Sequence, residues 1–371
     1  MTTNFKPVGK VHHYCPSSDL NMFNSITQHP EDTHVLWDPT EPIYSYPNVE
    51  YDQIQLNIDN WMKFELPPDS PLHRNFYHVS CCHKRTSGGD FNGPQFGVKV
   101  PWTDVYGFEM IYQILENFRR YRYTWDWYSK PEYLLSYTIG RPKKHRVEIL
   151  LHLIDLGLMP ESIVNFCNSS NLWNQFLTGY KHNPDIIEKI LPFAPQILHA
   201  ELGSRRVNGY HYHDKLIPGY DLTLCEVVSE TCHTYVLLSE KTFRPLLFGK
   251  PFIVLGGAKQ NEIMKSLGFV EYDELFNYNY QMEIDDDFTK YRDSLIPLCD
   301  IDTSPKALMD LKIKLRPKIE YNQSVVIKRL FDDSLIPDAW MIPPTELVKV
   351  DQWVSQGRDK IKNHEYFAQF V

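Results

Sequence analysis

The sequence predicts an α/β protein whose C-terminal half forms a doubly wound parallel sheet. The chain has 371 residues, a length that favours two domains over one. Hydrophobic residues make up 42% and charged residues 23%, which excludes a disordered, coiled-coil or collagen-like chain. From residue 133 onward, short apolar runs alternate with amphipathic stretches, a pattern typical of strands that alternate with helices.

The N-terminal third is irregular. Short apolar runs at residues 34–37 and 76–79 are separated by clusters of Pro, Asp and Gly, which predicts short strands joined by long loops. Residues 105–118 carry apolar side chains at helical spacing and predict a helix. We place the end of the N-terminal domain and the linker at residues 118–128, a stretch rich in Arg and aromatic residues.

The C-terminal half shows the alternation most clearly. Gly157 and Gly268 follow two of the expected helices and would end them, and a basic turn at 140–144 lies between a strand and a helix. The expected strands are residues 133–138, 234–238 and 251–255, and the expected helices are residues 145–156, 239–248 and 258–267. Ligands of such sheets bind beyond the carboxyl ends of the strands.

The composition of the chain indicates which kind of partner and which cellular compartment to expect. The 38 Lys and Arg residues are outnumbered by 47 Asp and Glu residues, giving a net charge of −9 that disfavours a general nucleic-acid binder. The seven cysteines are scattered and odd in number, which indicates reduced thiols. Neither a signal peptide nor a transmembrane stretch is visible, so we expect a soluble, cytoplasmic protein without a membrane partner.

One candidate anion site follows the strand expected at residues 234–238. The N-terminus of the next helix offers unpaired backbone N–H groups, and Lys241 adds a full positive charge, a combination that favours phosphate. Glu240 is placed to accept hydrogen bonds from ribose or sugar hydroxyls, and Pro245 would fall in the first helical turn. The alternative is a capped surface helix with an exposed Glu–Lys pair. The side chains of this segment are Ser239, Glu240, Lys241, Thr242 and Arg244.

A second basic junction lies at residues 137–146, again between a strand and a helix. Arginine presents a rigid fork that matches phosphate oxygens, and two such loops on one sheet edge would clamp a diphosphate. The alternative is a solvated basic face. The basic side chains are Arg141, Lys143, Lys144, His145 and Arg146.

The segment at residues 239–256 resembles the donor-binding signature of the α1,3-fucosyltransferase family, and especially the fucosyltransferase-like proteins of viruses and microbes. Residues 136–146 are similar to the stretch in which such proteins place a phosphate-binding arginine, at the position of Arg146. Glu230 falls where the family often has a carboxylate. The resemblance covers residues 130–330 of this chain.

The resemblance implies an inverting glycosyltransferase of the GT-B type, with two Rossmann-like lobes facing a cleft and no need for a metal or a cofactor. The donor would be a nucleotide sugar, with fucose the sugar suggested by kinship, and the acceptor a hydroxyl, most simply of a glycan. We expect an acceptor lobe at residues 1–128, a nucleotide-sugar lobe at 129–345, and a C-terminal segment at 346–371 that packs back across both.

Inversion also needs a carboxylate that takes the proton of the acceptor hydroxyl. Residues 34–42 are loosely similar to the family segment that carries this base, which makes Glu41 the first candidate and Asp38 the second. A surface turn with two acids is the alternative at this position.

Two rival functions stay open. The Arg and aromatic stretch at residues 118–128 is compatible with a transferase that decorates hydroxymethylated bases of viral DNA. The other rival is a catalytically silent module that binds a nucleotide sugar. Three groups with metal-ligand side chains are interpreted as ordinary because their spacing or setting is wrong for a metal site, namely residues 81–83, 211–213 and 285–287.

Overall fold

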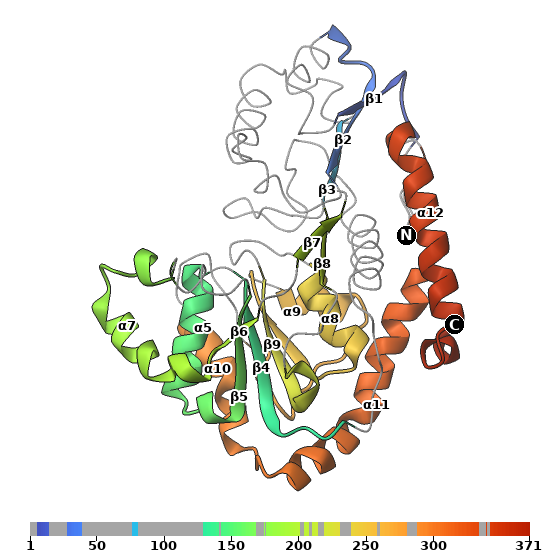
Figure 1. The fold of residues 1–371 in the computed structure, drawn as a ribbon. Coiled ribbons are helices and arrows are strands. Elements are labelled where there is room, and N and C mark those ends of the chain that lie inside the picture. Colours follow the sequence, from blue (N-terminus) through green and yellow to red (C-terminus); the bar gives the residue numbers. More distant parts are fainter. Residues whose placement is uncertain are drawn as a thin grey trace.

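The protein is a mixed α/β molecule in which a parallel sheet is flanked by helices (Figure 1). Its chain winds between strands and helices from residue 133 onward, as expected. The computed structural model describes residues 6–14, 28–38, 76–80, 129–140, 142–167, 174, 176–200, 204–207, 210–213, 219–230, 239–257, 260–279, 288–333, 339 and 342–371.

The main sheet has five parallel strands in the order β10-β9-β4-β5-β6. The chain builds the sheet outward from β4 through β5 to β6, then returns to the other side of β4 with β9 and β10. The direction of building therefore reverses between β4 and β9, as in a doubly wound sheet. The strands are β4 (Tyr133–Ile139), β5 (Ser162–Cys167), β6 (Leu198–Ala200), β9 (Thr223–Ser229) and β10 (Phe252–Leu255).

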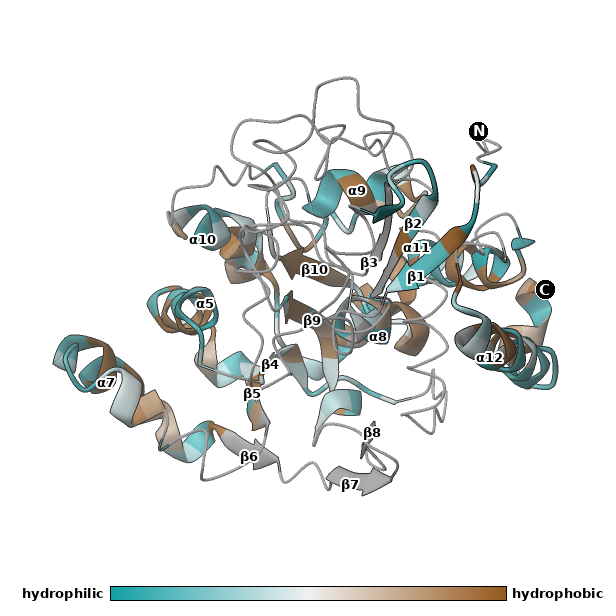
Figure 2. Cartoon of the chain, turned by 90° about the horizontal axis from the view of Figure 1, so that it is seen from above, coloured by the Kyte–Doolittle hydropathy of each residue, from teal (hydrophilic) through white to brown (hydrophobic). Residues whose placement is uncertain are grey.

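Helices cover both faces of this sheet. In the view from above, α5 and α10 lie on one side of the strands and α8 and α11 on the other (Figure 2). The contacts agree, because α5 packs on α7 and α10 whereas α8 packs on α11. These helices are α5 (Lys144–Asp155), α7 (Pro184–Ile190), α8 (Glu240–Phe248), α9 (Gln260–Ser266), α10 (Thr289–Leu295) and α11 (Pro305–Leu330).

Local sequence signals mark the ends of these helices. Gly157 follows α5 with φ 70° and Gly268 follows α9 with φ 92°, left-handed conformations that glycine adopts without steric cost. The side chain of Ser239 caps α8, and the side chain of Ser304 caps α11. The helices expected at 145–156, 239–248 and 258–267 are confirmed to within three residues at each end.

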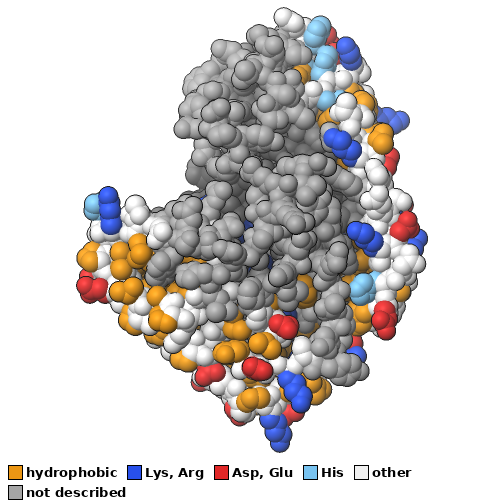
Figure 3. Space-filling model, in the orientation of Figure 1, with side chains coloured by type: hydrophobic (Ala, Val, Ile, Leu, Met, Phe, Trp, Pro, Cys, Tyr) orange, Lys and Arg blue, Asp and Glu red, His pale blue; other side chains and the backbone are white. Residues whose placement is uncertain are grey.

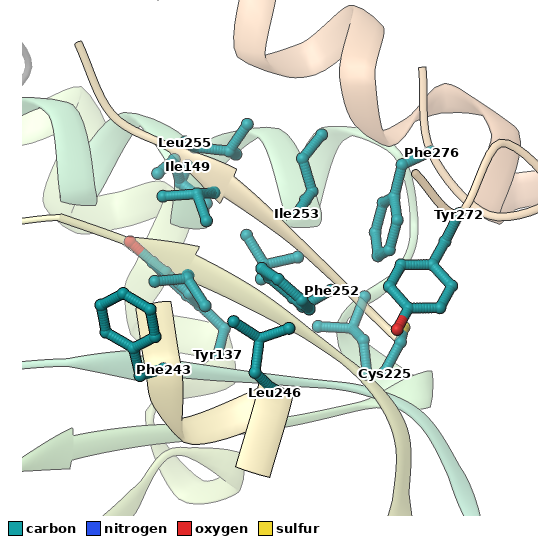
Figure 4. Packing of buried hydrophobic residues seen from close by; sticks show 14 of the residues in the cluster. Tyr137, Ile149, Cys225, Phe243, Leu246, Phe252, Ile253, Leu255, Tyr272 and Phe276 are labelled. Carbon is teal, nitrogen blue, oxygen red and sulfur yellow. The ribbon is translucent and has the colours of Figure 1, made fainter. Parts of the chain in front are cut away.

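The core lies on both faces of the central strands. All seven residues of β9 are buried. Figure 4 shows Phe243 and Leu246 of α8 against one face of β9 and β10, with Leu255 and Ile253 directed to the other. Burial on both faces is what near-continuous apolar strands of a parallel sheet require.

Two smaller sheets complete the described strands. Strands β1, β2 and β3 form a parallel sheet, which confirms the strands expected near residues 34–37 and 76–79. Strands β7 and β8 form an antiparallel pair. Their bounds are β1 (Val11–Tyr14), β2 (Thr33–Asp38), β3 (Phe76–Ser80), β7 (Ser204–Val207) and β8 (Tyr210–His213).

The C-terminal helix α12 (Pro344–Lys362) packs against α11 and the short helix η8 (Phe367–Phe370). Tyr366 donates a hydrogen bond to Gln323 of α11 at 2.8 Å, which fixes the end of the chain. Figure 1 shows α12 extending from α11 toward the level of β1. Within the described ranges, none of the helices combines the length and apolar character needed to cross a bilayer. The remaining short helices are η2 (Met159–Glu161), η3 (Leu191–Gln196), η4 (Tyr220–Leu222) and η5 (Ile296–Asp300).

One strand of the main sheet was missed by the sequence analysis. The strand expected at residues 234–238 lies outside the described residues, as does the helix expected at 105–118. The missed strand is β9, which pairs with β10. Glu226 in the middle of β9 obscured this strand, because an acidic residue in an apolar run normally indicates exposure.

Candidate anion-binding site

Helices α5 and α8 begin at the same edge of the main sheet. Helix α5 follows β4, and α8 follows β9 along the chain, and these two strands are neighbours. The reversal of strand order lies between them, which is where open parallel sheets bind ligands. The two junctions singled out by the sequence therefore come together at one point of the structure.

Glu230, directly after β9, links the two helix starts. Its backbone carbonyl accepts hydrogen bonds from His145 Nε2 at 2.9 Å and from Arg146 Nη2 at 3.2 Å. Its carboxylate accepts from the backbone N–H of Ser239 at 3.1 Å, from Ser239 Oγ at 2.6 Å and from Thr242 Oγ1 at 2.5 Å. The residue is fully buried. Glu230 therefore holds the first turn of α8 against the first turn of α5, and its expected contact with the donor stays a prediction.

Arg146 lies beneath the surface of the junction. It is 3% exposed, and its Nη1 lies 3.6 Å from the position that a Cβ on Gly140 would take. Its backbone carbonyl accepts a hydrogen bond from the buried Tyr137 hydroxyl at 2.8 Å. Burial raises the pKa of Tyr137 well above its ordinary value, so this hydroxyl stays a donor. The arginine expected to grip phosphate is thus anchored on both sides, and its positive charge lies under the helix starts.

Lys241 lies on the first turn of α8. Its side chain is half-buried, and its Nζ donates to Ser239 Oγ at 3.2 Å. The same oxygen accepts from the backbone N–H of Lys241 at 3.3 Å, which is the expected helix cap. Lys241 and Arg146 therefore belong to one hydrogen-bonded group that runs through Ser239 and Glu230.

Pro245 lies deeper in α8 than predicted. The helix begins at Glu240, so Pro245 is its sixth residue and not part of the first turn. Proline lacks the N–H that this position would donate to the carbonyl of Lys241. The expectation was wrong because the helix starts two residues before Thr242, immediately after the cap.

The charges at the start of α5 oppose the helix dipole. The first turn contains Lys144, His145 and Arg146 and has no acidic residue, although helix N-termini are stabilised by negative charge. Such an arrangement costs stability in the free protein and favours a bound anion, which would interact with the N–H groups, the dipole and the cations together. Lys144 is exposed at this position.

Arg244 is directed away from this edge, into the core. It is 7% exposed, forms an ion pair with Glu226 of β9, and lies over the ring of Tyr220 with 5.5 Å between Cζ and the ring centroid. Tyr220 donates a second hydrogen bond to the same carboxylate. Arg244 thus has a structural role, because β9 brings a buried carboxylate opposite the helix, and its role in donor binding stays a prediction.

Two buried polar side chains escaped the sequence analysis. Thr138 of β4 and Asn165 of β5 are aligned in register, and both lie in the carboxyl half of their strands. Among the described residues, neither the Thr138 hydroxyl nor the Asn165 amide has a hydrogen-bond partner. A buried polar group left without a partner costs about 1–3 kcal/mol. The signal in the sequence was an asparagine within an otherwise apolar strand.

Gly256 follows β10 and lies close to Glu230 and Gln260. A Cβ on Gly256 would lie 3.3 Å from Gln260 Oε1 and 3.5 Å from the Cβ of Glu230. Tyr291 also donates to the Gly256 carbonyl at 2.9 Å. The absence of a side chain at residue 256 therefore allows the end of β10 to approach Glu230.

Several predicted residues cannot be placed at the site. Asp38 is the last residue of β2 and Glu240 the first of α8, but their side chains lie outside what the structure describes. His211 and His213 lie on β8, again without described side chains. Outside the described residues altogether are Glu41, Arg141, residues 81–83, residues 118–128 and residues 285–287.

Comparisons with known proteins add nothing to this geometry: the chain matches no family model, no curated protein and no solved structure.

The role of Ser239 as a link can be tested by comparing two helix caps. Ser239→Ala removes both the cap of α8 and a donor to the buried Glu230 carboxylate, so we expect a loss of about 2–4 kcal/mol. Ser304→Ala removes the exposed cap of α11 and an exposed hydrogen bond with Asp302, and should cost about 1 kcal/mol. Urea unfolding measures both. Equal losses would show that the Glu230 contact contributes nothing to stability.

Proposed function

We propose that this chain is a metal-independent inverting glycosyltransferase that transfers a sugar from a nucleoside diphosphate to an acceptor hydroxyl. The observation that carries the proposal is the meeting of two helix N-termini, with Lys241 and Arg146, at the point where the strand order reverses. Each helix start favours one anionic group, so the pair suits a diphosphate. Fucose is the sugar suggested by the resemblance of residues 239–256.

The chemistry follows from these charges. As the acceptor oxygen bonds to the anomeric carbon, the bond from that carbon to the diphosphate breaks, and negative charge develops on the leaving phosphate. Lys241 and the dipoles of the two helix starts stabilise this charge, while Arg146 adds positive potential from beneath. The buried amide of Asn165 and hydroxyl of Thr138 offer further partners for the donor at the same edge.

We assign the base that deprotonates the acceptor to the N-terminal region. In this proposal the chain forms two lobes across a cleft, with β1 to β3 in the acceptor lobe, and a carboxylate there takes the proton of the acceptor hydroxyl. Glu41 is the first candidate and Asp38, at the end of β2, is the second. The base then releases the proton to water after the product leaves.

Binding of nucleoside diphosphates tests the anion site. Titration calorimetry with guanosine and uridine diphosphate should show one site, and Lys241→Ala should weaken it about 10-fold to 100-fold through loss of a charged hydrogen bond. Lys265→Ala is the matched control, because that lysine is 68% exposed and forms a surface pair with Glu271. Wild-type affinity in Lys241→Ala, or no binding by the wild-type protein, would overturn the phosphate assignment.

Transfer is tested next with nucleotide sugars and a panel of acceptors. Release of nucleoside diphosphate that depends on a glycan acceptor supports the proposal. Release that depends instead on duplex DNA with hydroxymethylated bases would move the protein to the DNA-modifying class. Nucleotide binding without transfer to any acceptor would assign it to the silent binding modules.

A further inference from the structure

Histidine and carboxylate side chains gather around β1 and the start of β2. Figure 3 shows pale blue histidine side chains close together at this end of the surface. Ligand atoms of His29, Glu31 and Asp32 all lie within 4.8 Å of one another, and His12 and His34 adjoin them. The cluster lies apart from the anion site, in a part of the chain that carries none of the residues discussed there.

Asp32 is held firmly at the centre of this group. Its Oδ1 accepts a hydrogen bond from the backbone N–H of Lys10 at 2.9 Å, and its Oδ2 lies 2.7 Å from His12 Nε2. Gly9, with φ 62°, leaves the space that this carboxylate occupies, since a Cβ there would collide with Oδ1. The carboxylate is therefore positioned by a different segment of the chain, and lone pairs of both oxygens stay available.

His29 is positioned from two directions. Its ring stacks on His12, with 5.5 Å between centroids and 9° between planes, and His12 stacks in turn on His34 at 5.1 Å. His34 Nε2 donates to the backbone carbonyl of His29 at 2.8 Å, and His34 Nδ1 is hydrogen-bonded to the Tyr14 hydroxyl at 2.7 Å. These contacts fix both the ring face and the backbone of His29.

We propose that His29, Glu31 and Asp32 bind a divalent transition-metal ion of the zinc type. One imidazole nitrogen and two carboxylate oxygens suit zinc, whereas magnesium and calcium prefer oxygen alone. Zinc lies about 2.0–2.2 Å from its ligands, so side-chain shifts of about 1 Å would complete the site. His12 is a positioning residue, because its ring is hydrogen-bonded to the Asp32 carboxylate, and ligating carboxylates are held by such partners.

The site is structural rather than part of the sugar transfer. Asp32 directly precedes β2, and the candidate base Asp38 is the last residue of β2. Six residues of strand span about 20 Å, so the two residues lie about that far apart. A bound ion would tie the segment before β2 to β1 through Asp32 and its contacts with His12 and Lys10. The metal therefore stabilises this small sheet and leaves the anion site untouched.

Zinc titration of the full-length chain tests the proposal, using protein without a histidine tag and after treatment with a chelator. Calorimetry should show one site that is weakened at least about tenfold by His29→Ala and by Glu31→Ala. The matched control is His182→Ala with Asp185→Ala, an exposed pair with the same spacing as His29 and Asp32, which should bind zinc as the wild type does. Zinc should also raise the thermal unfolding midpoint of the wild type and of this control only.

Each of four results would overturn the site, and three of them concern zinc alone. These are no zinc uptake by the wild type, unchanged affinity in both single variants, or an equal loss in the control pair. Displacement of zinc by an equal concentration of magnesium would also overturn it, since magnesium does not favour an imidazole ligand. Far-ultraviolet circular dichroism of each variant separates lost binding from lost folding.

Discussion

Replacing Arg244 with methionine is expected to destabilise the protein by about 3–5 kcal/mol, the usual cost of breaking a buried ion pair from one side. Glu226 is fully buried in the middle of β9, and Arg244 is the cation that faces it from α8. After the substitution, the carboxylate keeps the Tyr220 hydroxyl as a donor but loses its ion-pair partner. Urea unfolding measured at pH 7 gives the difference in free energy.

Two comparisons make this result specific. Glu226→Gln combined with Arg244→Met removes both charges of the ion pair and should recover part of the lost stability, because the carboxylate is no longer buried without its guanidinium partner. Arg316→Met breaks an exposed pair with Glu320 one helical turn away and should change stability by less than about 1 kcal/mol. A loss in Arg244→Met no larger than that of Arg316→Met would contradict a buried ion pair.

The second large effect is a pH dependence produced by Lys250. Burial lowers the pKa of Lys250 from 10.5 to about 7, against the opposing influence of Glu226. Between these two values the unfolded chain holds a proton that the folded protein lacks, so the contribution of Lys250 to stability rises with pH. The slope is about 1.4 kcal/mol per pH unit. The neutral amine still donates to the carbonyl and hydroxyl of Thr223.

Lys250→Met removes this slope. We expect the variant's stability relative to wild type to be highest near pH 6–7 and to fall steadily toward pH 10. Taking the difference between the two proteins cancels the opposite trend from buried Cys225 and Tyr272, whose raised pKa values lower stability at high pH. Lys265→Met, at an exposed lysine, is the control with a constant difference. A constant difference for Lys250→Met would mean that Lys250 titrates alike in both states.

Sequence patterns predicted the fold best where one physical rule dominates. Caps and glycine ends located α5, α8 and α9, because these signals depend only on local backbone chemistry. Strand β9 could not be predicted in the same way. Its central Glu226 is buried only because Arg244, on a later helix, neutralises it, and that pairing exists only in the tertiary structure.

The candidate site likewise contains features that the sequence could predict and features that it could not. The two basic junctions could be recognised in the sequence, because a strand followed by cations at a helix start has a clear electrostatic meaning. The position of Glu230 beneath them could not, since its partners come from two helices separated by about 90 residues of chain. The cluster of His29, Glu31 and Asp32 was also missed, because its ordering depends on His12 and His34 from paired strands.

The pairing of β4 with β9 in the main sheet affects how the chain folds while it is synthesised. Tyr133 of β4 pairs with Thr223 of β9, so the two partners are 90 positions apart. Ribosomes add about 5–20 residues per second, and β4 therefore waits for several seconds with one long edge open during synthesis. An open, apolar strand edge is a template for association with other chains. Co-translational chaperone binding should accordingly be strongest on nascent chains that end between β4 and β9.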